Sequence, residues 1–179
     1  AALVTVPAVW QTITSEAAIE SPLWAEALLL ESEQVREPVF SALAPAGHAV
    51  GLETIYEGYL VHYGRSRLFS PPDCDCALLL GDYLYAHGLV RVAATGDVAA
   101  VADLAELISL CSQARGEGRD GDGAAWAATA ASLGVGDLSS ARDALRLRND
   151  ASLLEASARS AAGDGPVDRA LAAHARLVG

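Results

Sequence analysis

Apolar residues recur at helical spacing along most of the chain. In residues 49–63 the large apolar side chains fall three or four positions apart: Leu52, Ile55, Tyr56, Tyr59 and Tyr63. Residues 98–111 repeat the spacing with Val98, Val101, Ala105, Ile108 and Cys111. This is the period of one face of an α-helix. Because no segment sustains the apolar–polar alternation typical of a strand, the pattern predicts an all-α protein without a sheet.

Capping and turn residues divide this pattern into helices. Ser21 and Pro22 are typical of a helix start and predict a helix from there to residue 44, kinked or divided at Pro38. Further helices are expected at residues 49–63, 74–94, 98–115, 124–133, 138–148, 151–162 and 166–177. Glycine and proline predict loops at 64–72 and 116–123, the latter (GEGRDGDG) flexible. The 179 residues are therefore expected to form one domain, a bundle of about eight helices.

Composition agrees with helices and narrows the classes of partner. Alanine and leucine, which favour helices, dominate the chain. The net charge is −11 at pH 7 and every basic residue is arginine, so binding to nucleic acid or anionic lipid is not expected. No stretch is long and apolar enough to predict a membrane span. The first ten residues lack a basic region and make a poor signal peptide, and three cysteines are an odd number. Reduced thiols and a cytoplasmic location are therefore expected.

One region carries a resemblance to a known family. Residues 77–117 run from an apolar stretch into Gly81-Asp82-Tyr83-Leu84 and end at Gly116-Glu117. This layout resembles the central region of the trans-isoprenyl diphosphate synthases. Residues 53–67 (ETIYEGYLVHYGRSR) stand where that family has its first metal-binding helix and its Arg-Arg-Gly, and residues 124–135 (AAWAATAASLGV) resemble its helix of small residues. The resemblance covers roughly residues 48–135 and implies an isoprenoid-synthase-like helical fold.

The departures from the family concern its chemistry. These enzymes ionise an allylic diphosphate with Mg²⁺ ions that two aspartate-rich motifs hold. No two acidic residues are adjacent here, only Glu57 stands in place of the first motif, and only Asp137, Asp143 and Asp150 in place of the second. The chain also lacks lysine, which the family uses for diphosphate binding. The resemblance therefore implies a non-catalytic accessory or regulatory subunit without a cofactor, or, if the chain is active, an enzyme that needs Mg²⁺.

Three residues are candidates for substrate binding. Arg65 and Arg67 match the place of the family's arginine pair, and guanidinium groups suit phosphate oxygens. The alternative is a structural or surface arginine pair. Asp82 follows Gly81 inside an apolar run, where a carboxylate is expected to be buried and paired, with Arg65, Arg67 or Arg91 as partner. Gly81 itself predicts close approach by a neighbouring helix or a ligand.

Metal sites are weaker hypotheses. Asp73, Asp75 and Asp82 can be arranged as an acidic metal site, but a helix cap followed by a solvated first turn is the simpler explanation of the first two and the expected one.

Zinc is a further alternative, with the Cys74-x-Cys76 pair, Cys111, and His62 or His87 as ligands. Buried, inert thiols are the competing explanation and the expected one.

Three functions remain open. The first is a non-catalytic homodimer, or a heterodimer with a catalytic prenyl synthase chain, paired through helices 74–94 and 98–111. The second is an active enzyme on a prenyl diphosphate or a related hydrophobic phosphorylated substrate. The third is a helical-repeat interaction module, suggested by the small residues and Gly-Asp turns after residue 124, although no period of about 34 residues is present.

Overall fold

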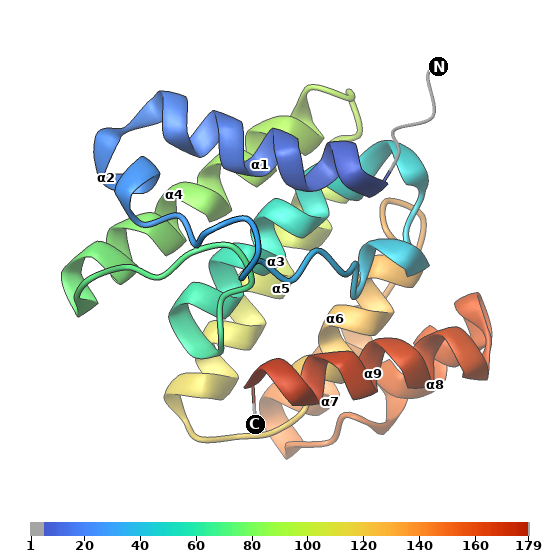
Figure 1. Ribbon diagram of the computed structural model, residues 1–179. Coiled ribbons are helices and arrows are strands. Elements are labelled where there is room, and N and C mark those ends of the chain that lie inside the picture. Colours follow the sequence, from blue (N-terminus) through green and yellow to red (C-terminus); the bar gives the residue numbers. More distant parts are fainter. Residues whose placement is uncertain (1–5, 179) are drawn as a thin grey trace.

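The computed structural model describes residues 6–178, and within that range the chain forms helices and no β-strand (Figure 1). The all-α prediction is therefore confirmed. The helices are α1 (Val6–Glu20), α2 (Pro22–Glu26), α3 (Ala49–Tyr63), α4 (Cys74–Ala93), α5 (Val98–Gly116), α6 (Asp122–Ala131), α7 (Ser139–Arg148), α8 (Ser152–Ala162) and α9 (Asp164–Val178). Two 3₁₀ turns, Ser41–Leu43 and Ala46–His48, precede α3.

The expected caps begin the two long helices in the middle of the chain. Asp73 Oδ1 accepts a hydrogen bond from the backbone N–H of Cys76 at 2.8 Å, at the start of α4. Asp97 Oδ1 accepts one from the N–H of Ala100 at 2.9 Å, at the start of α5. Each carboxylate satisfies a backbone donor that the helix itself leaves without a partner.

The predicted helix at 21–44 is wrong. Only α2 and the 3₁₀ turn Ser41–Leu43 form there, and residues 27–40 run as an irregular segment with a turn at residues 31–33. Its backbone pairs with the loop after α3: the N–H of Leu29 donates to Leu68 O at 2.9 Å, and that of Ser70 donates to Ala27 O at 2.7 Å. These backbone groups pair with residues some forty positions away along the chain instead of with helical neighbours. Local sequence signals for a helix cannot indicate such distant partners.

The first helix, α1, was not predicted. Its β-branched residues have low helix propensity, but Trp10 and Ile13 are only 1% and 2% exposed because they pack against α3 and α4. Tertiary burial therefore stabilises a helix that local preference does not favour. The segment judged a poor signal peptide lies outside the described residues in its first half, 1–5, and its second half begins α1.

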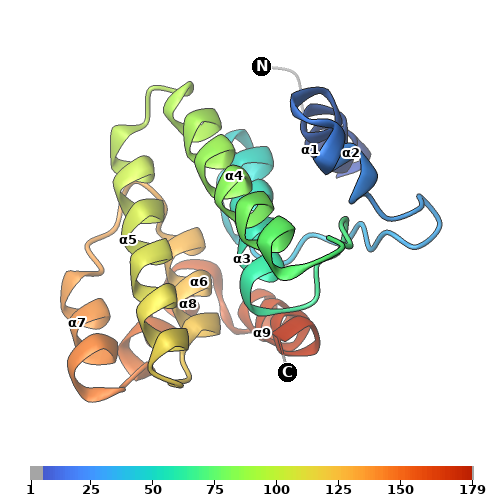
Figure 2. The ribbon, with the colours of Figure 1, turned by 90° about the vertical axis from the view of Figure 1, so that its left-hand side faces the viewer.

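The apolar interior is arranged around α3. Every residue of α3 from Gly51 to Leu60 is buried. On one side of it lie α5, α6, α8 and α9, which form the larger core, and on the other α1 and α2 pack against α4 and the loop residues Leu68 and Phe69 (Figure 2). An unpaired charge is costly on a helix that is buried on all faces. The two glutamates of α3, Glu53 and Glu57, therefore need partners.

Glycines allow α3 and α4 to lie close together in antiparallel orientation. A Cβ atom on Gly88 would lie 2.8 Å from the carbonyl oxygen of Gly51, and one on Gly58 would lie 2.9 Å from that of Gly81. The expectation that Gly81 marks close approach by a neighbouring helix is thus confirmed, since a Cβ there would also meet the ring of His62.

Candidate functional site

The two arginines that the sequence pairs as phosphate ligands lie in different environments. Arg67 is fully buried, with Nη1 2.8 Å from Glu53 Oε2 and Nε 2.9 Å from Glu57 Oε2. Its guanidinium carbon also lies 4.8 Å from the ring centre of Trp10 and 5.0 Å from that of Tyr56. Burial opposes its charge, but the two glutamates raise its pKa above the ordinary value. Arg67 therefore forms a structural ion-pair cluster with the two glutamates, and it also lines a small pocket of about 70 Å³ together with Arg65 and Arg176.

The glutamates of this cluster hold the two loops that flank α3. Glu57 Oε1 accepts hydrogen bonds from Ser66 Oγ at 2.5 Å and from the N–H groups of Arg67 and Leu68 at 2.8 and 2.9 Å. Glu53 Oε1 accepts from Ser41 Oγ at 2.5 Å. These two glutamates lie in the segment that stands where the resembled family has its first metal-binding helix. Here their oxygens instead accept hydrogen bonds from the two loops that flank α3.

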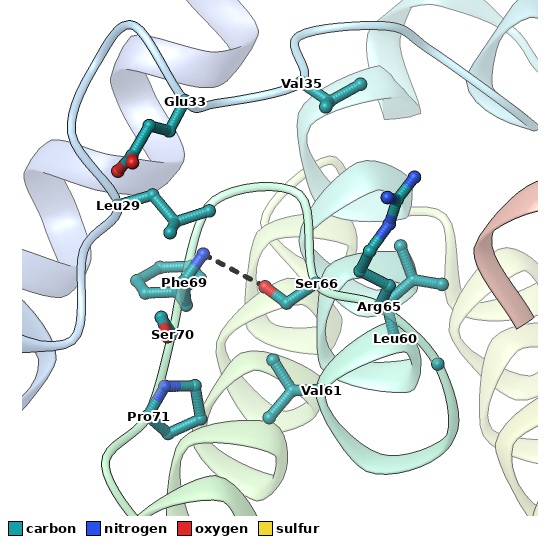
Figure 3. A pocket seen from close by; sticks show the side chains of 11 residues that line it. Leu29, Glu33, Val35, Leu60, Val61, Arg65, Ser66, Phe69, Ser70 and Pro71 are labelled. Carbon is teal, nitrogen blue, oxygen red and sulfur yellow. Dashed lines mark hydrogen bonds between the residues drawn. The ribbon is translucent and has the colours of Figure 1, made fainter.

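Arg65 lies at a surface pocket of about 460 Å³ between the irregular segment 29–35 and the end of α3. Its side chain extends toward Val35 along the edge of the pocket (Figure 3). It makes no ion pair or side-chain hydrogen bond with any residue in the described part of the chain. The walls are largely apolar and include Leu29, Leu60, Val61, Phe69 and Pro71. The pocket therefore combines an apolar surface with the unpaired guanidinium of Arg65 at its rim and the carboxylate of Glu33 in its lining.

Asp82 is exposed on the outer side of α4, and the expectation that it is buried against an arginine is wrong. Its side chain is 67% exposed, and Oδ1 lies 3.2 Å from Nε2 of His62. Arg91, one of the expected partners, instead pairs with Glu16 of α1, which also lies 2.8 Å from His87. Of the three residues predicted to bind substrate, Arg65 and Arg67 therefore share the lining of one small pocket, whereas Asp82 lies apart from them on α4.

The predicted metal ligands are not brought together. Asp73 caps α4 and Asp75 is exposed in its first turn, as the simpler explanation held. Among residues 6–178 no group of three or more His, Cys, Asp or Glu side chains has a geometry suited to a metal ion. Of the three thiols, Cys111 is buried but Cys74 is exposed, so the expectation of buried thiols is confirmed only for the former.

A second buried polar cluster was missed by the sequence analysis. Asp122, expected in a flexible loop, is the first residue of α6 and only 7% exposed. Its Oδ2 accepts hydrogen bonds from Tyr59 Oη, from Arg115 Nη2 at 2.6 Å, and from His174 Nε2 at 3.2 Å. His174 Nδ1 lies 2.9 Å from Tyr56 Oη. The cluster joins α3, α5, α6 and α9.

The protonation states in this cluster follow from its geometry. Burial alone would raise the pKa of Asp122, but the hydrogen bonds from His174 and Tyr59 and the charge of Arg115 hold it below its usual range. Burial raises the pKa of Tyr56 and of Tyr59, so both phenols keep their protons. His174 Nε2 lies against the Asp122 carboxylate as its hydrogen-bond donor, and Nδ1 shares a hydrogen bond with the Tyr56 hydroxyl group. Every side chain of this cluster is hydrogen-bonded to another member of it, as is expected of a structural role.

Sequence signals for this cluster were indirect. Asp122 lies in a run of glycines and charges that is typical of a mobile loop, and His174 stands alone on the helical apolar face of α9. Neither position reveals that four helices meet there. The tyrosines were correctly placed on the core face of α3, but their hydroxyl groups gave no indication of their partners.

The outer face of α4 exposes apolar side chains. We define it by four residues: Leu79, Ala86, Val90 and Ala93. All four are exposed, Leu79 at 57% and Val90 at 66%. α4 and α5 lie at the front of Figure 2, with no other helix over them. The apolar stretch with which residues 77–117 begin is therefore only partly buried, since Leu78 and Leu79 are each 57% exposed.

Comparison with known proteins gives no relative: no family model, no curated protein and no solved structure matches the chain. The resemblance to the trans-isoprenyl diphosphate synthases therefore stays a prediction. No helix in the described part of the chain is long and apolar enough to cross a membrane.

Proposed function

We propose that the chain is a non-catalytic helical subunit, a degenerate relative of the isoprenyl diphosphate synthases, that acts as a homodimer. The observation that carries this proposal is that the buried charged side chains are all paired with other charged side chains. Glu53, Glu57 and Arg67 neutralise one another around loop backbone, and Asp122 is held by three side chains. Groups committed in this way cannot exchange partners with a substrate without leaving buried charge unpaired.

The outer face of α4 supplies a surface for pairing. Leu79, Ala86 and Ala93 recur at intervals of seven residues, the repeat that lets two helices pack along a seam. The repeat is symmetric about Ala86, as a two-fold axis requires. An antiparallel pair of α4 helices centred there sets Leu79 against Ala93 and Asp82 against Val90. No Asp82 then faces the Asp82 of the second copy, which matters in a chain of net charge −11.

Sedimentation velocity over a series of protein concentrations tests the proposal. The wild-type chain is expected to sediment as a dimer, and Leu79→Glu or Ala86→Glu as a monomer, because each substitution buries a carboxylate at the seam. Leu147→Glu is the matched control, since Leu147 is 73% exposed on α7, outside the seam. A wild-type chain that stays monomeric at every concentration overturns the homodimer.

A second candidate function is binding of a phosphorylated apolar ligand at the Arg65 pocket. The observation that favours it is the unpaired guanidinium beside the apolar walls formed by Leu29, Val61 and Phe69. Geranyl diphosphate is a suitable probe, and the thermal unfolding midpoint is the readout. The midpoint is expected to rise with the probe in the wild type and in Arg148→Gln, whose arginine is exposed and distant, and less in Arg65→Gln. Equal shifts in all three proteins, or none, would exclude this candidate.

Adding Mg²⁺ to the same titration separates the two functions. A subunit without carboxylates to hold the ion gains nothing from it, so the shift with geranyl diphosphate is expected to be unchanged. A shift that appears only with Mg²⁺ and the diphosphate together, or release of inorganic pyrophosphate, would contradict the non-catalytic proposal and favour an active prenyl enzyme.

A further inference from the structure

The arginines that form no ion pair are unevenly placed on the molecule. Of the twelve arginines, eight pair with a carboxylate. The other four form no such pair within residues 6–178: Arg65, Arg148, Arg169 and Arg176. The sequence places no acidic side chain in residues 1–5 or at 179. Because the net charge is −11, uncompensated positive charges are scarce on this chain, and three of the four lie together.

These three arginines line one groove. Arg65 and Arg176 border the small pocket of about 70 Å³ described above, and Arg169 borders a pocket of about 380 Å³. The two pockets share three bordering residues: Glu37, Val39 and Ala173. They therefore adjoin and form one groove, which we call the α9 groove. Its walls are residues 35–42 on one side and α9 from Pro166 to Leu177 on the other. Figure 3 shows Arg65 extending toward the first of these walls.

The charge of the α9 groove is positive on balance. Among the described residues, Glu37 is the one acidic side chain in its lining. The two acidic side chains of α9 itself pair with Arg159 of α8 instead. Arg67 also borders the groove, but its buried cluster with two glutamates carries one negative charge in excess. Even after that charge and Glu37 are subtracted, the three unpaired guanidinium groups leave a positive charge in the groove, which favours an anionic partner.

The spacing of the arginines on α9 indicates the form of a matching anion. Arg169 and Arg176 are seven residues apart, close to two helical turns, so they lie on one face of α9 about 10 Å apart along its axis. A polyproline-II segment repeats every three residues, over about 9 Å. Acidic residues at every third position of such a segment therefore match the two guanidinium groups. Pro38, Pro166 and Ala170 give the residues between them an apolar surface.

We infer that the α9 groove binds an acidic peptide segment in polyproline-II form. Its carboxylates pair with the guanidinium groups of Arg169 and Arg176. A nucleic acid matches less well, because its charges continue beyond the groove onto the acidic remainder of the surface, whereas a short peptide interacts mainly with charges within a screening length of about 8 Å. The site is separate from the homodimer seam on α4, and neither Arg169 nor Arg176 lines the Arg65 pocket of the second candidate function.

Fluorescence anisotropy with a labelled peptide tests the inference. The probe is a fluorescein-labelled peptide of four Glu-Pro-Ala repeats, and the matched probe has Gln-Pro-Ala repeats with the same label. The glutamate peptide is expected to bind saturably, and more weakly as the salt concentration rises, whereas the glutamine peptide is expected not to bind. Arg169→Gln and Arg176→Gln should each weaken binding of the glutamate peptide about threefold, the effect of one lost exposed ion pair, and the double variant should weaken it about tenfold.

Arg148→Gln is the matched control. It removes the fourth unpaired arginine, on α7, and changes the net charge by the same amount, so its affinity for the glutamate peptide is expected to equal that of the wild type. All of the substituted arginines are exposed, which keeps the test independent of folding defects. Absence of binding, equal binding of the glutamine peptide, equal losses in Arg148→Gln and Arg176→Gln, or tighter binding of a single-stranded oligonucleotide would each overturn the inference.

Discussion

The Nε2–H of His174 donates a hydrogen bond to Asp122 Oδ2 over 3.2 Å, joining α9 to the first residue of α6. The two residues are 52 positions apart, and the contact closes the larger core near the end of the described chain. Arg115 and Tyr59 approach the same oxygen from α5 and α3. One carboxylate thus holds four helices together, and its ionisation bears on the stability of the whole domain.

We expect Asp122 to make stability depend on acid pH. Its pKa in the folded chain lies below the ordinary value of 3.8, so the stabilisation is complete above about pH 4 and is lost as the pH falls through the folded pKa. Asp122→Asn lacks this contribution and is expected to unfold with a free energy about 3 kcal/mol smaller at pH 7. Urea denaturation at pH 7 and at pH 3 should show the gap between the two proteins narrowing at the lower pH. Parallel pH profiles would contradict this role.

Arg65 and Arg67, two positions apart, are expected to respond very differently to the same substitution. Arg67→Met leaves Glu53 and Glu57 buried without a cation, so the free energy of unfolding should fall by about 3–5 kcal/mol. Arg65→Met removes an exposed side chain without an ion pair, and a change within about 0.5 kcal/mol is expected. Chemical denaturation of both variants checks this, and comparable losses would mean that the Arg67 cluster is not a buried ion pair.

The glycine contact between α3 and α4 gives a third prediction. Alanine is the better helix former, yet Gly88→Ala places a Cβ 2.8 Å from Gly51 O and is expected to destabilise by about 1–2 kcal/mol net. Gly116→Ala is the control, because nothing lies within 4 Å of that position, and it is expected to stabilise α5 by about 0.5–1 kcal/mol. In thermal denaturation, the unfolding midpoint should fall for Gly88→Ala and rise for Gly116→Ala. These opposite signs would show that packing, and not helix propensity, determines the effect of a substitution at Gly88.

The helices could be predicted from sequence wherever local signals and tertiary packing agree. α3 to α9 follow from apolar periodicity and from caps such as Asp73 and Asp97. The prediction failed at α1 and at residues 27–40, where the deciding contacts come from distant parts of the chain. Burial of Trp10 against other helices makes one segment helical, and backbone pairing of Leu29 with Leu68 keeps the other from forming a helix.

The polar residues were harder to interpret, because the same residue type serves at the surface and in a core. Arg65 and Arg67 look equivalent in sequence, but one of them turns inward where two glutamates on α3 stand one turn apart. Asp82 looks buried because its neighbours are apolar, although α4 exposes Leu78 and Leu79 as well. Apolar content alone cannot predict which face of a helix has no neighbour.

Thiol reactivity should separate the three cysteines. Cys74 is exposed and is expected to react with a disulfide reagent such as DTNB within the mixing time, while Cys111 is 1% exposed and burial raises the pKa of its thiol well above the usual value. Cys111 is therefore expected to react only after denaturation. Counting released thiolate in native and in denatured protein measures the difference. Because Cys76 is only partly buried, Cys111 is followed in a chain with Cys74 and Cys76 both replaced by serine, and rapid labelling of that chain would show that the core opens readily.

Cross-linking across the expected two-fold axis tests the geometry of the proposed dimer and not only its existence. In a chain with Cys74 and Cys76 replaced by serine, Ala86→Cys places two thiols at the point where the α4 helices cross. Oxidation is expected to yield a covalent dimer that reducing agent dissociates, because residues on a two-fold axis meet their own copies. Leu147→Cys in the same background is the control and should stay monomeric under oxidation. A dimer by sedimentation that Ala86→Cys fails to cross-link would place the interface on another face of the molecule, and α5 would then be the next surface to test.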